Sequence, residues 1–206
     1  MLTLYYSKGS SALAAHILLF ETGAVFEAEE VSIAKGQHLT PAFAALNPKQ
    51  RIPILATPEG VITENPAILE YITEMNPGSG LLPDSLHGRA KARSLCAYLG
   101  ATVHVNFAHL KRGARWADAP IAQASMAESV AENLAENARF LETCLERGPW
   151  ALGATYSYCD PYLFLMGRWM QMAGMGLSSY PNLSGHADAM RARTATKAAL
   201  AAHGLP

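Results

Sequence analysis

The stretch from Asn47 to Leu69, NPKQRIPILATPEGVITENPAIL, predicts a β-hairpin that runs directly into a helix. Its two apolar runs, Ile52–Leu55 and Val61–Thr63, are rich in β-branched residues, which favour extended backbone. Between these runs, Pro58 and Gly60 lie where a tight turn needs residues of restricted or permissive backbone conformation. We therefore expect two neighbouring strands joined by a short turn.

The end of the same stretch predicts the start of a helix. Pro66 suits a first helical turn, and the apolar residues Ile68, Leu69 and Ile72 follow it at helical spacing. The first N–H groups of a helix have no partners within the helix, and that end carries a partial positive charge. The sequence thus predicts a position close to Glu64 that favours binding of an anionic group.

Residues 1–76 as a whole read as an α/β domain. Leu2–Tyr6 is a β-type run, and Ala12–Glu21 has the apolar spacing of a helix. Val25–Ile33 alternates as a strand does, and Leu39–Leu46 fits a short helix. With the hairpin and its helix, the order becomes βαβαββα. That order, with a proline at the start of the third strand, resembles the thioredoxin-like fold.

The remainder of the chain predicts a linker over 77–86 and an all-helical domain over 87–206. Proline and glycine interrupt every periodicity in the linker. An apolar stripe then runs from Leu95 to Leu110, and His104 falls almost opposite this stripe on a helical wheel. Further helices are expected over Ile121–Leu145, and two or three more over Pro161–Met172 and Asn182–Ala202.

Composition excludes several classes of protein. Sixteen basic against 17 acidic residues, without a basic run, argue against nucleic-acid binding. No apolar run is long enough for a membrane span, and the N-terminus lacks the features of a signal peptide, so we expect a cytoplasmic protein. Three widely spaced cysteines argue against a disulfide framework or a zinc site, and the histidines lack ligand-like spacing, so no metal is expected.

Three motifs together resemble the glutathione-binding half of glutathione transferases. They are Asn-Pro, then Ile-Pro followed by two apolar residues, then Thr-Glu-Asn ahead of a helix. The resemblance implies that the bond between Ile52 and Pro53 is cis. It implies that the backbone of Ile52 pairs with the cysteinyl part of glutathione. It also implies that Glu64 and Asn65 hold the γ-glutamyl end.

The resemblance is closest to the bacterial beta class and covers nearly the whole chain. YYSKGSSALAAHILLFETG resembles the opening of that class, and LGATVH resembles the segment that carries its active-site histidine, here His104. Where that class has a cysteine that forms a mixed disulfide with glutathione, this chain has Ser11, which cannot form that bond. Ser10 matches the activating serine of the serine-type classes, whose hydroxyl hydrogen-bonds the glutathione sulfur.

The chemistry that this implies is stabilisation of a thiolate. A cysteine thiol has a pKa of about 8.5, so only a small fraction is the nucleophilic thiolate at neutral pH. A donated hydroxyl hydrogen bond and a helix N-terminus both favour the anion. Ser10 and Ser11 precede a helix, and either could supply these interactions, although a serine there also caps a helix without catalysing anything. His104 could donate to the sulfur or to the electrophile.

Other residues carry weaker assignments. Lys35 and Arg51 are the basic residues that could meet the glycine carboxylate of glutathione, as related enzymes use a basic residue there. Ser157-x-x-Asp160 is a variant of the capping box and is assigned to folding. The resemblance places a second-substrate pocket between the two domains, with these residues as its candidates: Asn106, His109, Lys111, Arg112 and Trp169.

The sequence therefore predicts a glutathione transferase that conjugates glutathione to small hydrophobic electrophiles, and the resemblance implies a homodimer. A glutathione-dependent isomerase or lyase would use the same site. A non-catalytic ligand-binding protein of the same fold is a further alternative, because fold alone does not establish activity. A thiol-disulfide oxidoreductase is disfavoured because no cysteine follows the first strand.

Overall fold

The computed structural model describes residues 1–206 and divides into two compact units. The first unit comprises Met1–Asp84 together with Met190–Pro206, and the second comprises Ser85–Ala189. The sequence analysis assigned the whole of 87–206 to the helical domain, so the structure differs at the C-terminal end. The physical reason is that the last helix packs along the first helix of the N-terminal unit.

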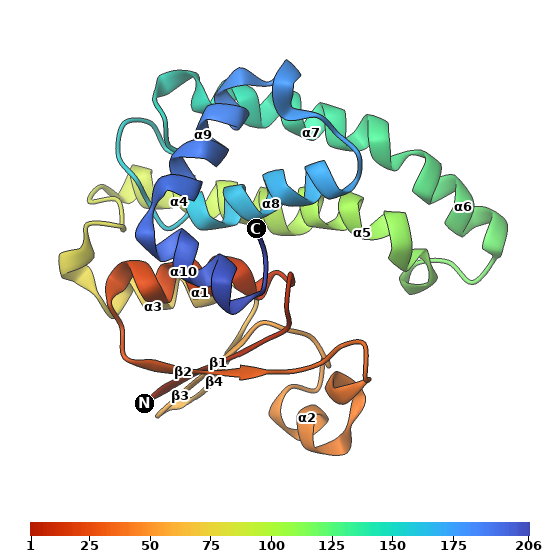
Figure 1. The fold of residues 1–206 in the computed structure, drawn as a ribbon, viewed down its shortest axis with the longest axis horizontal. Coiled ribbons are helices and arrows are strands. Elements are labelled where there is room, and N and C mark those ends of the chain that lie inside the picture. The colour runs from red at the N-terminus through yellow and green to blue at the C-terminus, as the bar shows by residue number, and fades with distance from the viewer. The chain divides into compact units, whose positions relative to one another are not determined.

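The first unit is built on a four-stranded sheet in the order β2-β1-β3-β4 (Figure 1). Strands β1 (Leu2–Tyr6) and β2 (Phe26–Glu30) are parallel, whereas β3 (Ile54–Thr57) is antiparallel to both β1 and β4 (Gly60–Thr63). The hairpin and the two N-terminal strands are thus confirmed, although β3 begins after Pro53 rather than at Ile52. A proline cannot donate to the ladder, so pairing starts at the following residue.

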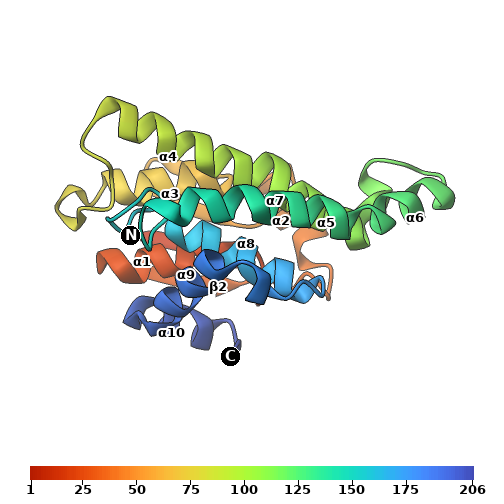
Figure 2. The ribbon, with the colours of Figure 1, turned by 90° about the horizontal axis from the view of Figure 1, so that it is seen from above.

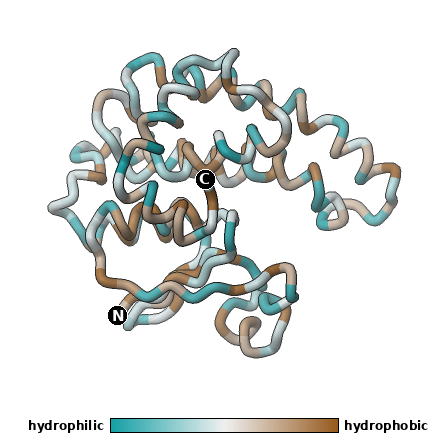
Figure 3. The backbone as a smooth tube through the Cα atoms, in the orientation of Figure 1, coloured by the Kyte–Doolittle hydropathy of each residue, from teal (hydrophilic) through white to brown (hydrophobic).

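Helices cover the sheet according to the alternation of its side chains. Along β1, Leu2, Leu4 and Tyr6 are buried, whereas Thr3 and Tyr5 are only half-buried. The helices of the first unit are α1 (Ala12–Thr22), α2 (Pro41–Leu46), α3 (Asn65–Glu74) and α10 (Thr194–Ala202). Helix α1 contacts β1, α3 and α10, and apolar residues are concentrated along α1 in Figure 3.

The short helix α2 packs through Phe43, which is buried with Val31 and Ile54. Its N-cap is Thr40, whose hydroxyl accepts the Phe43 N–H at 3.3 Å. This small cluster fixes the segment that leads from α2 into the hairpin.

The second unit is entirely helical. Its helices are α4 (Leu86–Tyr98), α5 (His104–Arg112), α6 (Pro120–Glu128), α7 (Val130–Cys144), α8 (Asp160–Met172) and α9 (Pro181–Ala192), whose last turn crosses into the first unit. The single helix expected over Ile121–Leu145 is divided between α6 and α7. The region expected to be helical over Asn182–Ala202 is divided at Arg193, whose backbone is extended. None of these helices combines the length and apolar character that crossing a bilayer would require.

Helices α4 and α5 are joined by a π-helical turn over Leu99–Val103, and they run on as one long rod in Figures 1 and 2. A π turn adds a residue to the repeat, so faces drawn at 3.6 residues per turn do not continue through it. The prediction that His104 lies opposite the apolar stripe is therefore wrong. The residue is half-buried, and its ring packs edge-on against Trp169 with centroids 4.8 Å apart.

A buried carboxylate organises the start of α8. Asp160 accepts the N–H of Ser157 at 2.7 Å, which is the bond that a capping box predicts, and it also accepts the Ser157 hydroxyl at 2.9 Å. Its other oxygen accepts the Ala151 N–H at 2.7 Å and lies 3.0 Å from His186 Nε2. Serine and histidine bond the same carboxylate rather than each other, so the trio has a structural role and is not a hydrolytic triad.

An aromatic cluster at α1 contains a histidine whose pKa is strongly lowered. His16 is buried, stacks on Phe20 with centroids 5.1 Å apart, and packs edge-on against Tyr6 and Phe26. Burial disfavours the imidazolium and lowers the pKa of His16 from 6.5 to about 4. His16 is therefore neutral in the folded protein at neutral pH.

This burial predicts acid sensitivity. Between pH 6.5 and about 4, His16 binds a proton in the unfolded chain but not in the folded chain. The free energy of unfolding therefore has its full value, as far as His16 is concerned, above pH 6.5 and declines as the pH falls. The shift corresponds to roughly 3 kcal/mol over this window. Urea unfolding at several pH values measures the slope. His16→Asn, which can still accept a hydrogen bond but does not titrate, should flatten that slope, and an unchanged slope would contradict the assignment.

Candidate functional site

The turn between β1 and α1 presents the hydroxyl of Ser10. The Ser10 N–H closes the turn onto the Ser7 carbonyl at 3.0 Å, and Gly9 has a φ of +69°, which favours glycine. Ser10 Oγ accepts two backbone N–H groups, those of Ser7 and Ala12, each at 3.3 Å. These bonds fix the oxygen at the start of α1 and leave its own proton available for donation.

Ser11 is bonded differently. Its buried hydroxyl donates to the Ile52 carbonyl at 3.3 Å, and its backbone carbonyl accepts the side-chain amide of Asn65 at 2.9 Å. The hydroxyl proton of Ser11 is thus already used within the protein. Through Ser11, the structure brings together three segments that the sequence analysis selected separately: the turn before α1, the Ile52–Pro53 step and the start of α3.

The segment before Pro53 is held by Asn47. This buried side chain donates to the Arg51 carbonyl at 2.7 Å and accepts the Lys49 N–H at 3.1 Å. Gln50 has a φ of 53°, a left-handed conformation within this tight turn. The Ile52–Pro53 peptide bond is cis, as the resemblance implied.

Glu64 and Asn65 stand at the N-terminus of α3. Glu64 is exposed and has a φ of 74° and a ψ of 125°, a region that residues with a Cβ rarely occupy. Buried Asn65 uses its amide nitrogen on Ser11, whereas its Oδ1 has no hydrogen-bond partner. Strained backbone and an unpaired buried oxygen both cost free energy, and both are typical of binding sites.

The basic residues differ from the expectation. Lys35 and Arg51 are exposed, and the structure shows no ion pair that links either to Glu64. Lys49, which the sequence analysis did not select, reaches both the Glu64 carboxylate at 2.5 Å and the Thr63 hydroxyl at 2.6 Å. Its place between Asn47 and Ile52 in the NPKQRIP segment is the signal that could have identified it.

His104 and the expected pocket residues of the helical domain lie in the second unit. Trp169 is buried between the rings of His104 and Phe107, the latter stacked at 4.8 Å. The amide of Asn106 donates to Asn137 at 2.8 Å, and the ring of His109 packs edge-on against Trp116. Lys111 and Arg112 are exposed at the end of α5.

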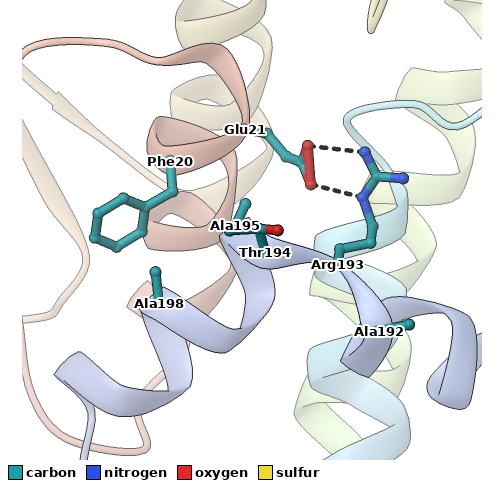
Figure 4. Close-up of a pocket in the computed structure, with 7 residues that line it drawn as sticks. All are labelled: Phe20, Glu21, Ala192, Arg193, Thr194, Ala195 and Ala198. Carbon is teal, nitrogen blue, oxygen red and sulfur yellow. Dashed lines mark hydrogen bonds and ion pairs between the residues drawn. The ribbon is translucent and has the colours of Figure 1, made fainter.

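Two hollows of the first unit lie away from the predicted site residues. One, of about 460 Å³, lies between the end of α1 and the start of α10, where Glu21 and Arg193 form an ion pair (Figure 4). The other, of about 510 Å³, lies beside α2 and is lined in part by Tyr5, Glu29 and Phe43. Burial, reinforced by the Glu29 carboxylate, raises the pKa of Tyr5.

The comparisons with known proteins show the family of this chain. Residues 1–74 match the model of the glutathione S-transferase N-terminal domain. The chain is 30% identical over 203 residues to glutathione S-transferase GST-4.5 of Xanthomonas campestris, with 98% of each chain covered. The chain belongs to the glutathione S-transferase family.

Solved structures show the same family fold over the whole chain. A glutathione transferase homolog from Sulfitobacter with bound glutathione is 34% identical, with a TM-score of 0.95 and 100% and 99% of the two chains covered. A beta-class glutathione S-transferase from Sphingomonas chungbukensis is 32% identical, with a TM-score of 0.86 and 99% and 100% covered. The thioredoxin-like domain and the helical domain expected from the sequence are thus those of this family.

The family relatives also include an isomerase. Maleylpyruvate isomerase of Ralstonia is 40% identical over 82 residues, which is 40% of this chain and 39% of that protein. The similarity to that isomerase is therefore local.

The backbone at Glu64 yields a prediction about stability and binding. Glycine adopts a φ of 74° without a clash, so Glu64→Gly should raise the free energy of unfolding by up to about 1 kcal/mol after its own entropic cost. Glu64→Ala keeps a Cβ in the strained conformation and should bring no such gain. Urea unfolding measures both.

The same two variants should lose affinity for glutathione if Glu64 binds it, which calorimetry measures. Lower stability of Glu64→Gly than of Glu64→Ala would contradict the strain, and unchanged affinity in both would contradict the binding role.

Proposed function

We propose that this chain is a glutathione transferase that binds glutathione, stabilises its thiolate and directs it at a small hydrophobic electrophile. The observation that carries the proposal is the junction at Ser11, which joins the Ile52 carbonyl and the Asn65 amide. That junction gathers the groups proposed for binding beside the turn that presents Ser10. The family assignment supports the proposal because the family uses glutathione as its co-substrate.

The groups at this junction fit a zwitterionic peptide. The unpaired Oδ1 of Asn65 can accept an N–H, and the free N–H groups at the start of α3 can meet a carboxylate. The Glu64 carboxylate suits an ammonium group, and the Ile52 backbone can pair with an extended peptide. We propose that Glu64, Asn65, Ile52 and Pro53 hold the γ-glutamyl and cysteinyl parts.

The glycine carboxylate of glutathione requires a cation. Lys35 and Arg51 remain proposed for this task, and both are exposed to solvent. Lys49 is paired with Glu64, so its ammonium group lies at the proposed γ-glutamyl end, whose α-carboxylate it could meet, rather than at the glycine end. A carboxylate that arrives near Glu64 would meet a cation held in place by two oxygens.

Bound glutathione would supply the thiol, and the chain would supply the groups that favour its ionised form. We assign the main role to Ser10, because its hydroxyl proton is available while that of Ser11 is directed at Ile52. Ser10 also stands at the N-terminal end of α1, where partial positive charge favours an anion. Ser11 then keeps the binding segments together. His104, held against Trp169, is proposed as a second donor.

A titration of bound glutathione distinguishes these roles. The thiolate absorbance of the wild-type complex should show a pKa below that of free glutathione. Ser10→Ala should raise this pKa by about one unit, which corresponds to 1.4 kcal/mol of lost anion stabilisation. Ser10→Thr retains the hydroxyl and is the matched control.

Ser11→Ala should weaken glutathione binding while leaving the thiol pKa of the remaining complex near that of the wild type. An unshifted pKa in the wild-type complex would contradict thiolate stabilisation. A pKa that responds to Ser11→Ala and not to Ser10→Ala would exchange the two roles.

A glutathione-dependent isomerase is the second candidate, favoured by the local similarity to maleylpyruvate isomerase. Both activities need the same thiolate but differ in the fate of glutathione. A conjugating enzyme consumes one glutathione for each electrophile, whereas an isomerase returns it after each turnover. We expect stoichiometric loss of free thiol with an aromatic electrophile such as a halonitrobenzene. Turnover of a cis-unsaturated diacid without loss of thiol would instead support the isomerase.

A further inference from the structure

We propose that His203, near the C-terminus, is a positioning residue that holds the Ser7–Ser10 turn in the conformation that presents the Ser10 hydroxyl. The inference rests on the proposed function, because the turn matters through the thiolate that Ser10 would stabilise. Its basis is a chain of hydrogen bonds from Gly9 through His203 to His16, within the first unit. Neither histidine was assigned a role from the sequence.

The Gly9 N–H fixes the donor and acceptor at each step of this series of hydrogen bonds. A backbone N–H can only donate, so Nδ1 of His203, 3.1 Å away, is the acceptor and carries no proton. Neutral His203 therefore carries its proton on Nε2, which donates to Nδ1 of His16 at 3.2 Å. One backbone donor thus sets the tautomers of two buried imidazoles, and each bond supports the next.

The end of α10 is built to keep His203 in this place. The Leu205 N–H bonds the Leu200 carbonyl at 2.9 Å, and the Gly204 N–H bonds the Ala201 carbonyl at 3.0 Å, which together form a Schellman motif. Gly204 has the required φ of +63°, and His203 is the C-cap residue. The same motif places Leu205 near Gly9, where a Cβ added to Gly9 would lie 4.0 Å from the Cδ2 atom of Leu205.

A second anchor holds the opposite end of α10. Arg193, which precedes the helix, forms a two-pronged ion pair with Glu21 at 2.6 and 2.8 Å, and Figure 4 shows the two side chains meeting between α1 and the segment that leads into α10. This ion pair joins the C-terminal end of α1 to the start of α10. At the other end of α10, His203 contacts Gly9, which precedes α1, and His16, which lies in the first half of α1. The two helices therefore run antiparallel. Helix α10 is therefore fixed to α1 at one end and to the Gly9 turn at the other.

The position of Gly9 connects this anchor to Ser10. Gly9 adopts a left-handed conformation that favours glycine, and Ser10 follows it directly, so a change at the Gly9 amide changes the direction of Ser10. Ser10 Oγ accepts the Ser7 N–H across the same turn. The His203 bond to Gly9 therefore belongs to the set of bonds that fix where the Ser10 hydroxyl points.

Two substitutions of His203 separate the two bonds of its ring. The amide oxygen of asparagine stands two bonds from Cβ, as Nδ1 does, so His203→Asn can still accept the Gly9 N–H. The amide nitrogen of glutamine stands three bonds from Cβ, as Nε2 does, so His203→Gln retains donation to His16 but loses the acceptor for Gly9. Glu21→Gln loosens the other anchor of α10 without touching the turn and is the control for general loss of helix docking.

The first measurement uses the protein without glutathione. Amide exchange of Gly9, followed by nuclear magnetic resonance, should be unchanged in His203→Asn and in Glu21→Gln. In His203→Gln the Gly9 amide should exchange at least about tenfold faster. The second measurement is the thiol pKa of bound glutathione. His203→Gln should raise this pKa by about half a unit, which is a threefold fall in the ionisation constant of the thiol, while His203→Asn retains the wild-type value.

Several results would overturn the inference. Unchanged Gly9 exchange in His203→Gln would show that the bond does not hold the turn. Equal losses in His203→Gln and Glu21→Gln, or in both His203 variants, would assign the effect to helix docking or ring packing. Faster exchange of the Gly9 amide in His203→Gln, with an unchanged thiol pKa, would show that the conformation of the turn does not affect thiolate stabilisation. If wild-type protein fails to lower the thiol pKa, the proposed function fails, and the Gly9 exchange still reports whether His203 holds the turn.

Discussion

The hydrogen bonds of buried Ser11 hold three segments of the first unit together. Its hydroxyl satisfies the Ile52 carbonyl and its carbonyl satisfies the Asn65 amide, so three distant segments share one residue. Buried polar groups that lose a partner cost roughly 1–3 kcal/mol each. The turn before α1, the cis-proline segment and the start of α3 are therefore held in one arrangement. This arrangement also fixes the positions of half-buried Ser10 and exposed Glu64, which lie on these segments.

The same region keeps features that a purely structural junction would not need. Glu64 has an unfavourable φ, and Asn65 Oδ1 is buried without a partner. Each feature costs free energy in the folded chain. Both are explained if a ligand donates an N–H to Asn65 Oδ1 and places an ammonium group at the Glu64 carboxylate. By contrast, the buried carboxylate of Asp160 in the helical unit is fully bonded, and its role is to organise the start of α8.

Local chemistry explains which parts of this structure could be predicted from the sequence. Strand β1, helix α1 and the hairpin have clear periodicity and turn residues, and the motif around Ile52, Glu64 and Asn65 is contiguous with them. The π turn before His104 has no compositional signature, so a helical wheel misplaced that residue. The break at Arg193 accompanies its pairing with Glu21, 172 positions away. Lys49, His16 and His203 were passed over because their roles are defined by partners distant in sequence, and Ser10 and Ser11 became distinguishable only through their hydrogen bonds.

We propose that Ser10, on a turn fixed by its neighbours, is the group that meets the glutathione sulfur. A crystal structure of this chain with bound glutathione tests it most directly. We expect the sulfur within about 3.5 Å of Ser10 Oγ, with the Ser11 hydroxyl still donating to Ile52. A sulfur bonded to Ser11, with that donation to Ile52 broken, would contradict the account. Glutathione bound away from the junction of Ser11, Ile52 and Asn65 would contradict it more completely.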